Sequence, residues 1–267
     1  MKIADTDWRE HLRTLLSLVT KTFLAGWLAS RVMLLVHEFL GHGLMATLLG
    51  ARAYDPHLSF FGDGSIAYER DFAFSPKETM LISAAGLTAQ LIVGTVTLFL
   101  LKKVRGKVWL EFFCLSFSAI SFLHFCYAIV SDIDHQHGDL WNLAENFSIP
   151  SEVYIAIGCI LTVVAGLYFA RLFSQLALRS IPPCSYLTRV LIVGFSVLTT
   201  AALQLTLSVL EGMGPVELSD HPHPIENEGL IVGGWIWIIL AISLALSALY
   251  TLRENPGPGV SRGGTNR

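Results

Sequence analysis

The chain has 267 residues, of which 53% are hydrophobic and only 15% are charged. A soluble domain carries about a quarter charged residues, so this composition excludes an ordinary soluble protein and indicates a polytopic membrane protein. The net charge of -3 gives no indication of a nucleic-acid partner.

Residues 1–23 are predicted to form an amphipathic segment before the first span. From Trp8 onward, apolar side chains recur at three- and four-residue spacing, while Arg9, Arg13 and Lys21 fall on the other side. This pattern predicts a helix with a basic face that lies in the membrane interface, next to anionic lipid. The alternative is that these residues are the start of a longer first span.

Six apolar runs are long enough to cross a bilayer. They predict an all-α polytopic membrane protein of about six transmembrane helices, with a metal-binding core over 24–145 and additional transmembrane helices over 146–252. The predicted spans are 24–49, 80–101, 108–130, 153–176, 186–210 and 230–252. After the first span, alternating residues flank Gly62-Asp63-Gly64, which predicts a small β-hairpin over 57–68. The Pro/Gly-rich tail, 253–267, is predicted to be disordered.

The distribution of Lys and Arg predicts the orientation of the chain. These residues occur before the first predicted span, between the second and third, and after the sixth, whereas loops 131–152 and 211–229 contain none. Because basic residues concentrate in cytoplasmic loops, we expect a multi-pass protein of the cell (inner) membrane with both termini in the cytoplasm.

The first span contains the stretch Val36-His37-Glu38-Phe39-Leu40-Gly41-His42-Gly43. A charged group at bilayer depth costs about 2.5–3.5 kcal/mol on insertion scales, so such a stretch indicates a functional site. Two histidines and a glutamate on one helix can hold a divalent metal beside a carboxylate. The metal lowers the pKa of its water towards ~7, and the carboxylate takes the proton. We therefore predict His37 and His42 as metal ligands and Glu38 as the general base.

A third metal ligand must come from elsewhere in the chain. The loop 132–139, rich in carboxylates and histidines, is the obvious donor. On the residues alone, six side chains remain candidates for the third ligand. Five lie in this loop (Asp132, Asp134, His135, His137 and Asp139), and the sixth is His124, the single histidine of the third predicted span.

The sequence from His37 to His42 resembles the zinc motif of the site-2 protease class of intramembrane metalloproteases. Residues 45–52 resemble the helix end after that motif, the predicted hairpin resembles the β element that follows, and 84–91 resembles the Ala-Gly-Pro-x-Ala-Asn motif of the next span. The resemblance covers roughly 24–145. It implies a zinc enzyme that cleaves a peptide bond within or next to the membrane, with Gly138-Asp139 supplying the third metal ligand.

The motif is one residue longer than the usual HExxH of that class. On a regular α-helix His37 and His42 would lie about 140° apart, whereas the usual spacing leaves only ~40°. A π-bulge, which adds one residue to a helical turn, would return both imidazoles to one side, and Gly41 would ease it. In the next span, Gln90 and Leu87 stand where the family has Asn and Pro.

Other functions are compatible with the same residues. Glu38 and His42 share a helix face, as do His135 and Asp139 if their loop is helical, which resembles the paired motifs of CAAX-type membrane proteases that activate water without zinc. A non-proteolytic membrane metalloenzyme, such as a lipid hydrolase or a di-iron oxidase, and a non-catalytic scaffold are further alternatives. For a protease we expect a membrane protein or peptide substrate, received by strand addition at an edge of the hairpin 57–68.

Overall fold

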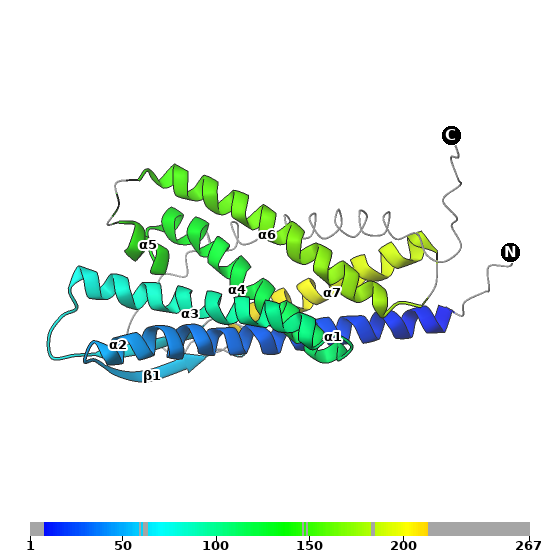
Figure 1. Cartoon of the computed structure of the whole chain (residues 1–267), viewed down its shortest axis with the longest axis horizontal. Coiled ribbons are helices and arrows are strands. Elements are labelled where there is room, and N and C mark those ends of the chain that lie inside the picture. Colours follow the sequence, from blue (N-terminus) through cyan, green and yellow to red (C-terminus); the bar gives the residue numbers. More distant parts are fainter. Residues whose placement is uncertain are drawn as a thin grey trace.

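Helices make up most of the computed structural model, which describes residues 8–212 except 59, 61–63, 146, 148, 183 and 184 (Figure 1). One stretch of the first helix, η1, is a π-helix. The elements are α1 (Trp8–Leu35), η1 (Val36–Gly43), α2 (Leu44–Leu48), β1 (Arg52–Leu58), β2 (Gly64–Glu69), α3 (Pro76–Lys103), α4 (Val108–His135), α5 (Asp139–Ala144), α6 (Ser151–Arg179) and α7 (Tyr186–Gly212).

Four helices in the described part of the chain are long and apolar enough to cross a membrane. They are Trp8–Leu48, Pro76–Lys103, Val108–Asp134 and Ser151–Arg179. The predicted helical architecture is therefore confirmed, and four of the six predicted spans match helices that are long and apolar enough to cross a membrane. The fifth predicted span, 186–210, falls on α7. The apolar part of this helix, Leu187–Thr200, is shorter than the four candidate spans. The sixth predicted span and the predicted disordered tail lie outside the described residues.

The first helix is longer than the first predicted span. α1, η1 and α2 form one continuous helix, Trp8–Leu48, so residues 8–23 run directly into the membrane span. Leu18, in the middle of that segment, is only 1% exposed and packs in a core with Phe112 and Phe169. Residues 8–23 are therefore part of one longer first helix, as in the alternative given above.

Small and hydroxyl-bearing residues bring α3 close to α4. Ser118 on α4 donates a hydrogen bond to the carbonyl oxygen of Gly94 on α3, with a distance of 2.9 Å, and its hydroxyl lies 2.9 Å from that of Thr97. A Cβ atom added to Gly94 would lie 2.6 Å from the Cβ of Ser121. Close backbone approach through small residues is typical of helices packed in membranes, and here it fixes α3 against α4.

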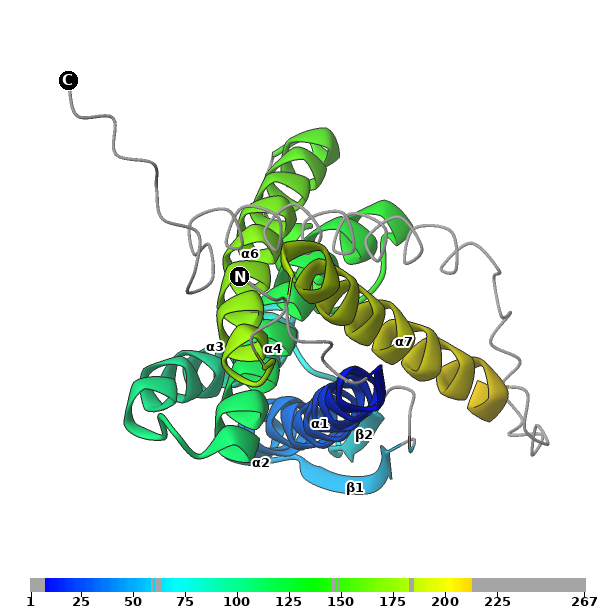
Figure 2. The same cartoon turned by 90° about the vertical axis from the view of Figure 1, so that its right-hand side faces the viewer.

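A two-stranded antiparallel hairpin follows the first helix, as predicted. It begins earlier than the predicted range, because Arg52 pairs with Glu69 at its open end. The indole Nε1 of Trp27 on α1 donates to the carbonyl oxygen of Phe60 at 2.9 Å, and the two rings are in contact. Seen along α1, the hairpin lies on one side of this helix and α7 on the other (Figure 2).

Arg70 joins the hairpin to the helices on either side of it. Its guanidinium donates to the carbonyl oxygen of Leu49 at 3.1 Å and to both carboxylate oxygens of Glu78 at 2.9 and 3.1 Å. The same group lies 4.2 Å from the ring centres of both Phe72 and Phe74. A planar cation held by a forked carboxylate and two aromatic faces is well ordered, so the end of the hairpin is fixed to the start of α3.

The helices η1 and α3 approach each other very closely at glycine positions. A Cβ atom added to Gly41 would overlap the Cα of Gly86 and lie 2.9 Å from the carbonyl oxygen of Ala85. Neither neighbour is a flexible side chain, so any larger residue at position 41 must push the two helices apart.

We therefore expect Gly41→Ala to destabilise the protein by about 1–3 kcal/mol, the usual cost of overpacking. Gly194→Ala is the matched control, because a Cβ atom there meets nothing within 4 Å. In the helix α7 it should be neutral or stabilising by about 0.5–1 kcal/mol. Thermal unfolding of both variants in detergent measures the difference; equal stability of the two would contradict the close contact.

Candidate metal centre

The π-helix η1 brings the two histidines of the motif together. His37 and His42 are five residues apart, and their Nε2 atoms lie 3.0 Å from each other. The rings meet edge to face, with centres 4.6 Å apart, and both side chains are buried. Because a π-turn holds one residue more than an α-turn, the longer spacing places both imidazoles on one side, as the sequence required.

Asp139, the first residue of α5, completes a group of three. Its Oδ2 lies 3.1 Å from Nε2 of His37 and 3.0 Å from Nε2 of His42, so the three atoms form a nearly equilateral triangle. A tetrahedral ion with bonds of about 2.0–2.1 Å separates its ligand atoms by about 3.3–3.4 Å. Only a slight widening is needed, so these residues could hold a metal ion.

The other ring nitrogens are held by carbonyl oxygens of α3. Nδ1 of His42 lies 2.8 Å from the carbonyl oxygen of Ile82, and Nδ1 of His37 lies 3.0 Å from Oε1 of Gln90. A carbonyl oxygen only accepts, so each Nδ1 donates, and in the neutral imidazole each Nε2 would then offer its lone pair to an ion in place of the proton that it shares with Asp139. Gln90 is fully buried, and its amide nitrogen donates to the carbonyl oxygen of Ser121, which turns its oxygen towards His37.

Gly86 provides the space that the imidazoles occupy. A Cβ atom at this position would overlap the ring of His42 and lie 3.0 Å from Cε1 of His37. Beside its resemblance to the family motif, the sequence pattern Ala84-Ala85-Gly86 is equally well explained by close helix packing. The structure shows that the absence of a side chain at Gly86 also makes room for both predicted metal ligands.

The loop before Asp139 is held in place by Asp132. α4 ends at His135, and Gln136 and Gly138 both have positive φ, of 52° and 101°. Oδ2 of Asp132 then accepts a hydrogen bond from the backbone N–H of Leu140 at 2.9 Å. A side chain at Gly138 would collide with the carboxylate of Asp132. Asp132 therefore positions Asp139 and does not itself belong to the group of three residues that could hold a metal ion.

The remaining candidates for third ligand fall outside the triangle. Asp134 and His137 are exposed, and neither belongs to the group that could hold a metal. The ring of His124 lies edge-on to that of His37, with centres 5.7 Å apart, so it borders the group from α4. The side chain of His135 lies outside what the structure describes.

Glu38, the predicted general base, is buried on η1 next to His37, with 8% of its surface exposed. The hairpin lies against it, since a Cβ atom at Gly64 would be 3.6 Å from Cγ of Glu38. Tyr68 on β2 belongs to the same surroundings: burial, and then the charges of Asp139 and Glu38, raise the pKa of its phenol. Sequence reasoning missed Tyr68, because only the folding of the hairpin onto η1 brings it near.

The ionisation of Asp139 reflects two opposed effects. Burial favours the neutral acid, but hydrogen bonds and charge interactions with His37 and His42 outweigh it and hold the pKa of this carboxyl below its usual range. Asp139 is therefore a carboxylate at neutral pH, as a metal ligand must be.

Comparisons of the chain with family models, with curated proteins and with solved structures find no significant match. Function must therefore be inferred from the side chains of this site and their geometry.

We expect Asp139→Ala to weaken zinc binding by more than about 100-fold, because loss of even an outer partner of a ligand costs about 10–100-fold. Asp134→Ala is the matched control, since this exposed carboxylate lies outside the metal-binding group. Competition with a chromophoric chelator measures both affinities. An unchanged affinity in Asp139→Ala would remove Asp139 from the site.

Gln90→Leu should weaken zinc binding by about 10–100-fold, because the orientation and tautomer of His37 are then no longer fixed. Gln175→Leu, a half-buried glutamine of α6, should leave the affinity unchanged. The same chelator competition provides the measurement, and circular dichroism checks that both variants fold. Equal affinities would show that Gln90 does not support the ligand.

Proposed function

We propose that this chain is an intramembrane zinc metallopeptidase, a hydrolase that cleaves a membrane protein or peptide within or next to the bilayer. One observation carries the proposal: a π-turn in an apolar helix directs His37 and His42 towards Asp139, with Glu38 beside the first ligand. Two histidines and a carboxylate with an open fourth position are a donor set typical of catalytic zinc.

Zinc held by His37, His42 and Asp139 would act as a Lewis acid and lower the pKa of a water molecule towards ~7. Glu38 accepts a proton from the attacking water on its carboxylate. The water oxygen bonds to the peptide carbonyl carbon, the C–N bond breaks, and Glu38 donates the proton to the leaving nitrogen. The products are a carboxylic acid and an amine, so protons and atoms balance.

The hairpin offers a way to present the substrate. Most of β1 is exposed, whereas β2 faces η1, where Ile66 lies near Gly43. An extended substrate segment that pairs with the free edge of β1 would form backbone hydrogen bonds. A helical substrate would have to unwind to make this pairing, which exposes its peptide bonds to attack. The partly exposed Tyr68 retains its phenolic proton and offers a hydrogen-bond donor on this side.

The location of the site follows from the proposed orientation. With both termini in the cytoplasm of the cell (inner) membrane, loop 131–152 lies on the opposite side because it lacks Lys and Arg. α5 and the metal centre would then lie near the non-cytoplasmic face of the bilayer.

The CAAX-type alternative loses one of its premises. It requires His135 and Asp139 to share a helix face, but the chain leaves α4 at His135 and turns through two residues of positive φ before α5 begins. A non-proteolytic metalloenzyme is the second candidate, because two histidines and one carboxylate are also the ligand set of non-haem iron oxygenases. Metal analysis separates these alternatives: zinc, iron or no metal.

Glu38→Gln provides the decisive test. We expect about one zinc per chain to remain in this variant, since the ligands are untouched, while cleavage falls by about 10²–10⁴-fold. The measurement combines mass spectrometry of metal content with labelling of new N-termini in membranes that contain the wild type or the variant. Glu152→Gln, at the exposed start of α6, is the matched control.

Each outcome assigns a function. Termini within or next to membrane spans that require Glu38 would support the peptidase. Identical termini with zinc bound would contradict it and favour a scaffold or another hydrolase, and bound iron would favour an oxidase.

A further inference from the structure

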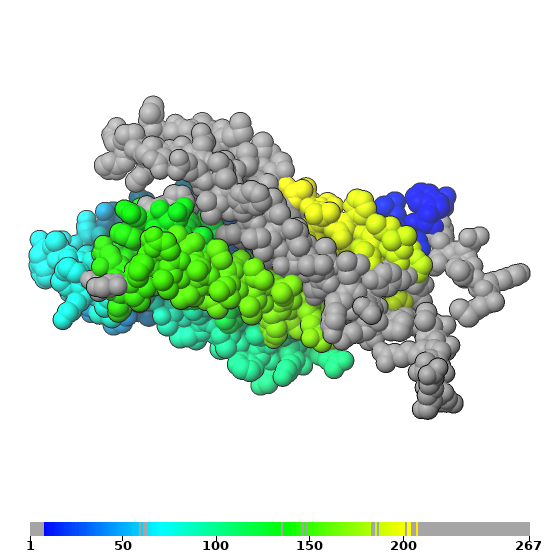
Figure 3. All heavy atoms as spheres, turned by 90° about the horizontal axis from the view of Figure 1, so that it is seen from above, coloured from blue at the N-terminus to red at the C-terminus, as the bar shows by residue number. Residues whose placement is uncertain are grey.

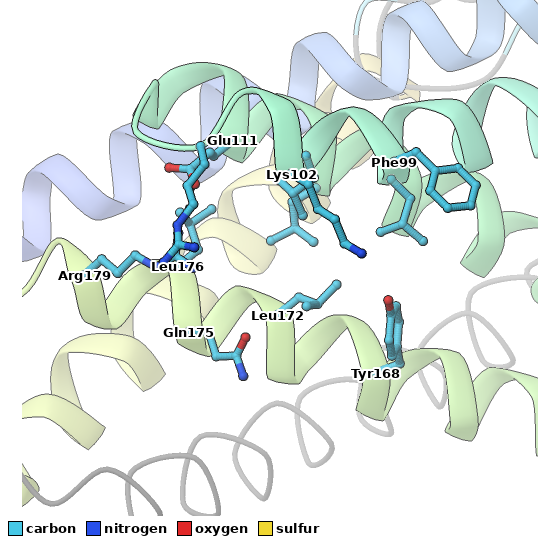
Figure 4. A pocket seen from close by; sticks show the side chains of 12 residues that line it. Phe99, Lys102, Glu111, Tyr168, Leu172, Gln175, Leu176 and Arg179 are labelled. Atoms are coloured by element: carbon cyan, nitrogen blue, oxygen red, sulfur yellow. The ribbon is translucent and has the colours of Figure 1, made fainter.

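A second candidate site lies at the other end of α3. There α3, α4 and α6 line an open cavity of about 490 Å³ (Figure 4), a volume within the range of about 300–1,000 Å³ that ligand pockets occupy. Its first lining residue on α3, Leu98, is twelve residues beyond Gly86, which corresponds to about 18 Å along the helix. The cavity is therefore separate from the metal centre.

One part of the cavity is apolar. It is lined by five leucines from three helices: Leu98 and Leu101 of α3, Leu115 of α4, and Leu172 and Leu176 of α6. α6 lies across the face of the molecule seen in Figure 3. The apolar surface continues beyond the cavity along this helix.

The continuation follows from helical spacing. Leu161 and Val164 are exposed, and Tyr168 and Leu172 follow at four-residue intervals. Side chains three or four residues apart share a helix face, so these residues form one largely apolar strip that runs from the cavity along α6.

The other part of the cavity is basic. Arg179 donates to Oε1 of Glu111 at 3.0 Å, and Glu111 is only 4% exposed, so this buried carboxylate is neutralised. Lys102 and Arg105 also line the cavity, and neither forms a salt bridge within the described part of the chain. Two positive charges therefore remain without a partner of opposite sign there.

The close view shows how these groups are directed. Lys102 extends from α3 into the space above Leu172, and the hydroxyl of Tyr168 points from α6 towards α3 (Figure 4). An ammonium and a phenol thus converge on the space beside the apolar wall. A phosphate with acyl chains attached would satisfy both parts of the cavity, whereas a soluble anion would leave the leucines uncovered.

We propose that this basic groove, lined by Lys102, Arg105, Tyr168, Leu172 and Arg179, binds one anionic phospholipid. The phosphate contacts Lys102 and Arg105, and the chains follow Leu172 and the apolar strip of α6. The excess of two positive charges selects an anionic headgroup over a zwitterionic one, because the latter brings its own cation.

Native mass spectrometry of the full-length protein in mild detergent tests this proposal, with phosphatidylglycerol and phosphatidylcholine of identical chains as probes. We expect selective retention of one phosphatidylglycerol per chain. Neutralising both cations in Lys102→Gln/Arg105→Gln should weaken phosphatidylglycerol binding about 30-fold, since each basic residue near a membrane surface contributes about a factor of five to the affinity for anionic lipid.

Lys103→Gln/Lys107→Gln is the matched control. These lysines lie at the same turn between α3 and α4 but do not line the groove, so phosphatidylglycerol should be retained. Leu172→Trp, which fills the groove without changing its charge, should also weaken lipid binding. Unchanged circular dichroism and thermal unfolding of each variant show that the fold persists, and because these measurements need no bound zinc, the test stays independent of the proposed peptidase function.

Three results would overturn the proposal. Equal retention of both lipids would remove the headgroup selectivity. Equal loss in both charge variants would indicate general surface attraction and no groove. Displacement of the lipid by a polyglutamate peptide, but not by inorganic phosphate, would assign the groove to an acidic protein segment.

Discussion

The architecture of the metal centre depends on the direct backbone contact between Gly41 of η1 and Gly86 of α3. Ile82, Gly86 and Gln90 are spaced by four residues and so form one stripe along α3. Gly86 provides space for the imidazoles, while the carbonyl oxygen of Ile82 and Oε1 of Gln90 accept hydrogen bonds from their Nδ1 atoms. If the helices stood further apart, both histidines would lose these partners at once, because a single helix face provides them.

The π-turn is compatible with the membrane because it leaves the backbone bonded within the helix. At its end, the N–H of Leu44 bonds to the carbonyl oxygen of Phe39, five residues earlier, as well as to that of Gly41. In a bilayer every backbone group must find such an internal partner. The extra residue between His37 and His42 therefore rotates the second imidazole without exposing polar backbone to lipid.

The sequence alone predicts the parts of the site that depend on local geometry. The angle between His37 and His42 follows from their spacing. A regular α-helix would hold the two imidazoles apart, so a shared face requires a π-turn, and the structure contains one at η1. The choice of Asp139 over Asp132 depends on where α4 ends, which two positive φ angles determine and helical periodicity does not show. The role of Gln90 as a partner of His37 depends on the register of α3 against η1, which is a tertiary property. Likewise, the amphipathic pattern of 8–23 has the same period whether its apolar face meets lipid or, as here for Leu18, other helices.

The three candidate ligands belong to two different parts of the fold. His37 and His42 are on the helix that continues from α1, whereas Asp139 begins a short helix tied to α4 through Asp132. A bound ion would therefore cross-link segments about a hundred residues apart in sequence, and its binding energy would add to the stability of their association. At a free metal concentration 1,000 times Kd this contribution is about 4 kcal/mol. Docking of α5 onto the bundle and occupancy of the centre are then a single linked equilibrium, so metal depletion would loosen the fold at this end as well as stop any reaction there.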